Sequence, residues 1–246
     1  MRHPLILAAA LVPLLAACGD NRPNAPAETS PAVSEPAPGV PEDASSEAAT
    51  TETVQTAPVP APGEQGGTDD WRTVATDGDA ARLTRLDDAW REALQEARAA
   101  GFGQQIRAMG ALADPAAGQP GRLQPAPGQY NCRTFKLGKM GETGLGYVAY
   151  PAFRCLVELT PGGDLILSKM TGSQRTRGLI YPDTDRRLVF LGAQAWGSGE
   201  TGFPLYGEQP QRDQIGVVER IGDQRWRLVL PWPKQESKLD VMELTR

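Results

Sequence analysis

Short alternating runs fill the second half of the chain and constrain its fold more than any other feature. From Tyr130 onward, apolar and polar residues alternate with a period of two, and no long helical pattern interrupts them. Such alternation is typical of β-strands that bury one face. Strands are predicted at 130–135, 153–159, 165–167, 187–191, 215–221, 225–230 and 239–244. The segments Pro161-Gly162-Gly163 and Gly222-Asp223 are typical of the turns between them.

A helical pattern precedes these strands. One apolar stripe recurs at spacings of three and four residues: Leu83, Leu86, Trp90, Ala93 and Ala97. Asp77 or Asp79 is expected to cap the start of this helix, and Gly101 to end it. Apolar residues within 106–112 predict a second, short helix.

The strands and helices together predict an α+β fold. Seven or eight short strands in succession favour an antiparallel meander, which usually closes into a barrel or forms a sandwich. Residues 188–191 and 228–230 are apolar on both strand faces, so something must cover the second face. The helical pair is the available cover. We therefore expect a small antiparallel β-barrel, a lipocalin-like meander of 7–8 strands, preceded by a short helical pair.

The N-terminus has the pattern of an export signal. Arg2 precedes an apolar stretch, 4–16, that is too short to span a bilayer. The sequence Leu15-Ala16-Ala17-Cys18 resembles the bacterial lipobox, which predicts a signal peptide over 1–17 and a lipid on Cys18. A chance cysteine after an ordinary signal peptide, or a short membrane anchor, is the alternative. Gly19 rather than Asp after the cysteine favours the outer over the inner membrane.

Residues 18–70 have the composition of a tether. From Gly19 to Asp70 there are nine prolines, no aromatic residue, and ten acids against the single base Arg22. Low hydrophobicity with high like charge does not offset the entropy of ordering, so disorder is predicted for this segment. A segment that binds a specific partner is the alternative interpretation.

Residues 71–246 are expected to form a single folded domain, helical over 79–113 and mostly β over 129–245. They hold 23 bases and 20 acids, which gives no basic surplus for a nucleic-acid partner. The only histidine of the chain, His3, lies in the signal, so His-dependent nucleophiles and zinc motifs are excluded from this domain. We expect no cofactor and no metal site; Asp183-Thr184-Asp185 matches ordinary turn chemistry rather than a calcium loop.

Cysteine parity predicts a structural disulfide. With Cys18 lipidated, Cys132 and Cys155 remain, and both lie on apolar faces of predicted strands. Paired thiols persist as disulfides in an oxidising compartment such as the cell envelope. A redox pair is the alternative, although the Cys-x-x-Cys spacing is absent.

Arginines beside aromatic residues supply the candidate ligand site. Five lie within or beside apolar runs: Arg133, Arg154, Arg187, Arg220 and Arg227. We select Arg133, Arg175 and Arg187, together with Tyr130 and Tyr147, as candidates. Facing inward, they would form an apolar wall with a cationic end, suited to a small amphipathic anion. Facing outward, their stems would cover apolar surface in contact with water, and both interpretations stay open.

Several segments resemble one known family when they are taken together. The segments are Gly128-Gln129-Tyr130-Asn131-Cys132-Arg133, 147–151, 153–155, 171–175, 187–192, 216–220 and 226–231. As a set they resemble a family of proteobacterial envelope proteins described as a domain of unknown function. The resemblance implies an exported protein and supplies no activity, ligand or catalytic residue. Gly128-Gln129-Tyr130 is also similar to the opening of lipocalin-like barrels, where many members carry Trp in place of this Tyr.

We therefore expect a lipid-anchored, periplasm-facing envelope protein that is not an enzyme. Its β domain is expected to act as a scaffold or to bind a small amphipathic anion or an envelope protein. The lipid on Cys18 is expected to attach the protein to the membrane. The alternative is an envelope hydrolase that uses paired carboxylates, such as Glu158 with Asp164 or Glu219.

Replacing Cys18 with Ser should release the protein from the membrane fraction. The physical reason is that multiple acyl chains anchor a protein stably, and the apolar stretch 4–16 is too short to replace them. The measurement is sedimentation of membranes after a salt wash, followed by immunoblotting. A Cys18→Ser protein that still sediments with membranes contradicts the lipoprotein prediction.

Overall fold

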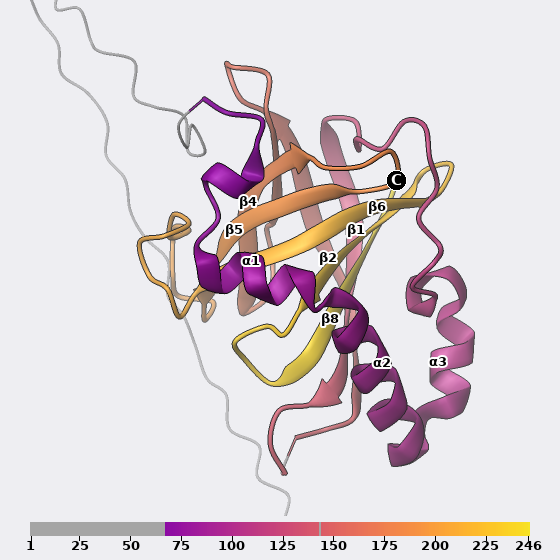
Figure 1. Cartoon of the computed structure of the whole chain (residues 1–246). Coiled ribbons are helices and arrows are strands. Elements are labelled where there is room, and N and C mark those ends of the chain that lie inside the picture. The colour runs from indigo at the N-terminus through magenta and orange to yellow at the C-terminus, as the bar shows by residue number, and fades with distance from the viewer. Residues whose placement is uncertain (1–66, 143) are drawn as a thin grey trace, which may run out of the picture. The chain divides into compact units, whose positions relative to one another are not determined.

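The computed structural model describes residues 67–142 and 144–246 (Figure 1). Its N-terminal part is helical. A 3-10 turn, η1 (Trp71–Thr73), precedes α1 (Asp77–Thr84), α2 (Leu86–Ala97), a π-helical turn η2 (Arg98–Phe102), α3 (Gly103–Met109) and a 3-10 turn η3 (Gly110–Ala113). No helix within the described ranges is long and apolar enough to cross a membrane. The signal, Cys18 and most of the tether lie outside the described residues.

The rest of the chain forms a closed antiparallel barrel of eight strands in sequence order. The strands are β1 (Gly128–Lys139), β2 (Tyr147–Leu159), β3 (Leu165–Lys169), β4 (Gln174–Pro182), β5 (Leu188–Trp196), β6 (Asp213–Gly222), β7 (Arg225–Pro231) and β8 (Ser237–Thr245). β1 pairs with both β2 and β8, which closes the sheet. The α+β barrel predicted from the sequence is confirmed.

Seven strands match the predicted segments, and β4 is an additional strand that the alternation does not predict. The composition of 171–175 is typical of a polar loop, but β4 begins at Gln174 and pairs with β5 through Pro182. Its first residues are polar on both faces, and Gly178 follows them, so the usual apolar alternation is missing. The glycine is required because a Cβ at Gly178 would lie 2.2 Å from the carbonyl oxygen of Leu191.

The helical segment differs from the predicted pair in two ways. Thr76, rather than Asp77 or Asp79, caps α1, and its side chain accepts a hydrogen bond from the backbone N–H of Asp79. The expected first helix is also split at Arg85 into α1 and α2. The two parts follow different strands, because α1 contacts β6 whereas α2 contacts β1 and β8. Gly101, with φ of 91°, ends the helical run as expected.

The helices cover the outer wall of the barrel, as the doubly apolar strands predicted. α1 and α2 lie along one side of the sheet in Figure 1. Trp90 and Leu94 of α2 share one buried cluster with Val189, Leu191 and Val229, which point outward from β5 and β7. The outward faces of these strands are therefore part of the core.

Arg227 fastens this helical layer to the sheet. Its side chain is fully buried, and its Nε donates to Oε2 of Glu219 at 2.7 Å on the neighbouring strand. Its Nη1 donates to the carbonyl oxygens of Ala111 at 2.8 Å and Asp114 at 2.7 Å, just after α3. The guanidinium also lies 5.0 Å from the ring of Trp90. One charged group thus joins β6, β7, α2 and the end of the helical segment.

Asp183, in the turn between β4 and β5, holds the start of the folded segment. Its carboxylate accepts hydrogen bonds from Trp71 Nε1 at 3.0 Å, Arg72 Nη2 at 3.1 Å and Arg187 Nε at 2.7 Å. Burial acts to raise the pKa of Asp183, but the hydrogen bonds from Trp71 and Arg187 outweigh it and hold that pKa below its usual value. The predicted turn is thus an attachment point for the N-terminal segment.

A second apolar cluster fills the barrel interior. It is built from alternate residues of the strands, including Tyr130, Val157, Phe190 and Leu228. The predicted disulfide joins Cys132 of β1 to Cys155 of β2 across a Cα–Cα distance of 5.8 Å. The sulfur of Cys155 lies 3.9 Å from that of Met242, so the bridge is part of the packed interior.

Removing the disulfide should destabilise the barrel. Replacing Cys132 and Cys155 together with Ala should lower the free energy of unfolding by about 3 kcal/mol, because the unfolded chain regains the entropy of the bridged loop. The measurement is urea denaturation of the double variant and the oxidised wild type without reductant, with wild-type protein denatured in the presence of reductant as the control. Equal midpoints for the double variant and the oxidised wild type would show that the bridge does not form in the folded protein.

Candidate functional site

The two ends of the barrel interior differ in chemistry. Toward one end the inward residues are apolar and carry the disulfide. Toward the other, where β3 ends and β4 begins, the inward positions become polar: Thr134, Lys136, Lys169, Gln174, Thr176, Gln194 and Asp240. The polar side chains at this end do not fill it, and a cavity remains there.

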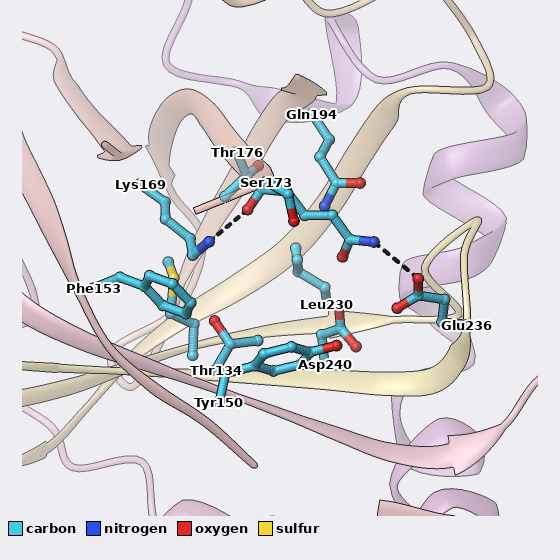
Figure 2. Close-up of a pocket in the computed structure, with 12 residues that line it drawn as sticks. Thr134, Tyr150, Phe153, Lys169, Ser173, Thr176, Gln194, Leu230, Glu236 and Asp240 are labelled. Carbon is cyan, nitrogen blue, oxygen red and sulfur yellow. Dashed lines mark hydrogen bonds between the residues drawn. The ribbon is translucent and has the colours of Figure 1, made fainter. Parts of the chain in front are cut away.

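The cavity has a volume of about 140 Å³ and is open at this end of the barrel. Twelve residues line it, and they are drawn in Figure 2: Thr134, Tyr150, Phe153, Lys169, Ser173, Gln174, Thr176, Gln194, Leu230, Glu236, Asp240 and Met242. They come from β1, β2, β3, β4, β5, β7 and β8 and from the loops at this end. The barrel as a whole, rather than one motif, forms the site.

Lys169 is the functional residue that stands out in this cavity. It is the last residue of β3 and follows Leu165 and Leu167 on the inward face. Its exposed fraction is 6%, and its Nζ donates to the carbonyl oxygen of Gln174 at 2.6 Å. The Nζ also lies 3.9 Å from the ring centroid of Phe153 (Figure 2). Within the described residues, Lys169 has no carboxylate partner.

The surroundings of Lys169 weaken its hold on its proton. Burial, followed by the charges of Lys136 and Arg175, lowers the pKa of Lys169 to about 8, although Asp240 acts in the opposite direction. Even so, the group is mostly protonated at pH 7. The cavity therefore presents a cation that neither water nor a carboxylate of the described chain fully compensates.

The other interior lysine is already neutralised. Lys136 Nζ lies 3.0 Å from Oδ2 of Asp240 and 3.5 Å from a carboxylate oxygen of Glu236. Burial acts to lower the pKa of Lys136, but Asp240 outweighs it and holds that pKa above its ordinary value. Ser237 donates a hydrogen bond to the other oxygen of Asp240. Asp240 and Glu236 line the cavity and form a polar wall, and Lys169 is not a member of their ion pairs with Lys136.

The remaining walls combine aromatic, aliphatic and amide groups. Tyr150 and Phe153 lie side by side with ring centroids 6.5 Å apart, and Leu230 and Met242 supply aliphatic surface. Across the opening, the side-chain amide of Gln174 donates to Glu236 at 3.1 Å (Figure 2). The site thus has an apolar floor, the ammonium group of a lysine and a hydrogen-bonded rim.

The five candidates selected from the sequence do not converge, which corrects that expectation. Arg133 and Tyr147 both line a groove on the outer face beside α3. Arg175 bonds the backbone oxygen of Glu200, and Arg187 pairs with Asp183. Tyr130 points inward at the opposite end, where its hydroxyl donates to Ala126. The outward positions of Arg133 and Arg175 follow from strand parity, since their neighbours Cys132 and Thr176 face inward.

The carboxylates of the alternative hydrolase each have another partner. Glu158 accepts a hydrogen bond from Arg177 at 3.0 Å, and Glu219 pairs with Arg227 beneath the helices. Asp164 hydrogen-bonds Thr160 in the turn between β2 and β3. Each group thus has a structural role in the turn or sheet where it lies.

Lys169 carries a signal in the sequence that is separate from the pattern of arginines beside aromatic residues. In Leu165-Ile166-Leu167-Ser168-Lys169, the lysine is in phase with the two leucines that face the interior. Lys136 is in phase with Tyr130 and Cys132 in the same way. A basic residue on the inward phase of a strand is the pattern that would have located the cavity.

Replacing Lys169 with Met should stabilise the protein at pH 7 by roughly 1 to 3 kcal/mol. The pKa of about 8 lies below the unfolded value, so the folded state binds fewer protons between these two values. Burying the charged ammonium therefore lowers the stability of the wild type fully below pH 8, and this destabilisation disappears as the pH rises through about 10.5. The variant also loses the hydrogen bond to Gln174, which subtracts about 1 kcal/mol from the gain.

The measurement is urea denaturation of both proteins at pH 7 and at pH 10, where the difference should shrink. Lys238→Met is the control, because Lys238 lies on the outer face and pairs with Glu92 and Glu96. If Lys169→Met is less stable than the wild type at pH 7, the buried ammonium does not destabilise the fold.

Comparison with known proteins places the chain in a family without supplying an activity. A family model described as a domain of unknown function, DUF4893, matches residues 71–244. Searches of curated proteins and of solved structures find no significant match. The matched range covers the helical segment and nearly all of the barrel, which is more than half of the sequence. The chain therefore belongs to the DUF4893 family, a domain of unknown function that folds in this protein as a closed eight-stranded barrel.

Proposed function

We propose that this protein is a lipid-anchored, non-catalytic envelope protein whose barrel binds a small amphipathic carboxylate. The observation that carries the proposal is the buried ammonium of Lys169, which lines an open cavity without a carboxylate partner among the described residues. The anchor at Cys18 and the export signal rest on the sequence pattern alone.

The pairing of charges around the cavity supports an anionic ligand. Lys136 and Lys169 equal Asp240 and Glu236 in number, but both carboxylates lie against Lys136. Lys136 is matched by Asp240, with Glu236 nearby, whereas the contacts of Lys169 are a carbonyl oxygen and an aromatic ring. An ammonium group has three donors, and a carboxylate could accept from those that remain. Such a ligand would compensate the buried charge and stabilise the folded protein.

The size and walls of the cavity restrict the rest of the ligand. A volume of about 140 Å³ resembles the roughly 150 Å³ that accommodates a benzene ring in an engineered cavity. Phe153, Tyr150, Leu230 and Met242 offer apolar surface beside Lys169. We therefore assign the ligand to small monocarboxylates that carry one ring or a short aliphatic chain.

The absence of histidine from the sequence after His3 supports a binding role over catalysis. The carboxylates of the alternative hydrolase also support it, since Glu158 and Glu219 are engaged in ion pairs with Arg177 and Arg227. An ammonium with a pKa near 8 is suited to holding an anion at neutral pH, because it keeps most of its charge.

Benzoate and hexanoate should raise the melting temperature of the full chain at pH 7, and uncharged benzamide should not. The reason is that only the carboxylates compensate Lys169. The measurement is thermal denaturation at fixed ionic strength, with dissociation constants from isothermal titration calorimetry. Lys169→Met should weaken carboxylate binding by about tenfold or more, which corresponds to about 1.4 kcal/mol per decade.

Two variants control the interpretation. Lys169→Arg keeps the positive charge and should retain part of the affinity, whereas Lys238→Met on the outer face should bind like the wild type. Equal shifts with benzoate and benzamide, or unchanged benzoate affinity in Lys169→Met, would refute the proposal.

A further inference from the structure

Three arginines converge at the end of the barrel opposite the Lys169 cavity. Arg122 precedes β1, Arg220 lies near the end of β6, and Arg246 follows β8. In an up-and-down barrel these positions share one end, while the end of β3 and the start of β4 lie at the other. The three side chains line a pocket of about 230 Å³ together with Ala126, Asp223, Gln224 and Trp226.

Much of the hydrogen-bonding capacity of these arginines is unused within the described residues. Arg122 has no hydrogen bond or ion pair there. Arg220 donates through Nη2 to the carbonyl oxygen of Pro120 at 2.8 Å, but its buried Nε has no partner. Arg246 donates through Nη2 to the carbonyl oxygen of Pro127 at 2.6 Å. A guanidinium group carries five donors, so each of these arginines has donors without a protein partner within the described residues.

The charge of the pocket is also unbalanced. Asp223 is its only carboxylate side chain among the lining residues, and Oδ1 lies 4.0 Å from Arg220 Nη1, at the limit of an ion pair. Asp223, Arg122 and Arg246 are all exposed, so water screens their charges, whereas Arg220 is largely buried. Three guanidinium groups lie against this one carboxylate side chain, so the side chains of the lining carry a surplus of positive charge.

We propose that this pocket binds a phosphate group in its dianionic form. The positive surplus favours an anion of high charge, and guanidinium groups bind phosphate oxygens through paired, charge-assisted hydrogen bonds. The site is independent of Lys169, because Phe190, Leu228 and the disulfide fill the interior between the two ends. The phosphate can belong to a small phosphate ester or to a lipid headgroup, and both present the same oxygens to the arginines.

Phenyl phosphate should bind to the full chain at pH 7.5, as measured by isothermal titration calorimetry. Arg122→Gln should weaken this binding by about tenfold, because it removes one guanidinium that faces the anion. Arg122 has no partner in the described chain, so the melting temperature of the unliganded variant should be unchanged. Arg98→Gln, at an exposed position in η2 and outside the lining of this pocket, is the matched control and should bind like the wild type.

The pH dependence tests the charge of the ligand. The second pKa of a phosphate monoester is about 6, so the affinity should fall between pH 7.5 and pH 5 as the dianion becomes a monoanion. The arginines keep their charge over this range. No binding of phenyl phosphate, an affinity independent of pH, or equal losses in Arg122→Gln and Arg98→Gln would each overturn the proposal.

The two sources of phosphate are distinguished by their acyl chains. Glycerol phosphate and dioctanoyl phosphatidic acid carry the same monoester group, with dioctanoyl phosphatidylcholine as the lipid control. Equal affinity for glycerol phosphate and phosphatidic acid identifies the ligand as a small phosphate ester. Tighter binding of phosphatidic acid alone identifies the ligand as a lipid headgroup. Equal binding of both lipids shows that the acyl chains, rather than the phosphate dianion, are recognised, and overturns the proposal. Lys169→Met should leave these affinities unchanged, which separates this site from the carboxylate site.

Discussion

The buried guanidinium of Arg227 is the interaction on which the arrangement of helices and barrel depends. Its positive charge compensates the carboxylate of Glu219 on the adjacent strand. Because the Arg227 side chain is fully buried, water cannot replace Glu219 as its partner. Breaking a buried pair of this kind typically costs about 3–5 kcal/mol, because the remaining charge has no partner. Its bonds to the carbonyl oxygens of Ala111 and Asp114 also fix where the helical segment ends. With the outer wall covered there, the strands can be apolar on both faces.

The interior of the closed meander is polar at one end and apolar from the middle to the other end. Inward positions near the start of β4 are polar and leave a cavity, whereas those near the disulfide pack closely. The two lysines of the interior differ in their partners. Lys136 forms an ion pair with Asp240, whereas Lys169 donates a hydrogen bond to the uncharged carbonyl oxygen of Gln174. Only an uncompensated group of this kind gains substantially from an external anion.

Much of the fold could be predicted from the sequence. The periodicity of apolar residues indicates which segments form strands, and the even number of remaining cysteines indicates a disulfide. The alternation around Tyr130 and Cys132 identified β1, and the two cysteines left after Cys18 identified the bridge. β4 could not be found in this way, because Gln174 and its neighbours lack apolar alternation and are ordered by pairing with β5. Its hydrogen-bond partners are β3 before it and β5 after it, and the pairing with both strands is not visible in its own residue pattern. The candidate site was less predictable, because strand parity turns Arg133 and Arg175 outward, and the importance of Lys169 depends on the charges that the closed barrel places around it.

The attachment of Trp71 and Arg72 to Asp183 determines how mechanical load enters the domain. A pull from the N-terminal side meets these hydrogen bonds first and then the helices on the outer wall. Each of these contacts can yield in turn by peeling, one group at a time. The strands that close the barrel, β1 and β8, are paired from Asn131 to Lys139 of β1 and follow the helical segment in the chain. A load on the N-terminal side would therefore reach the helical layer before it reaches the paired strands of the barrel.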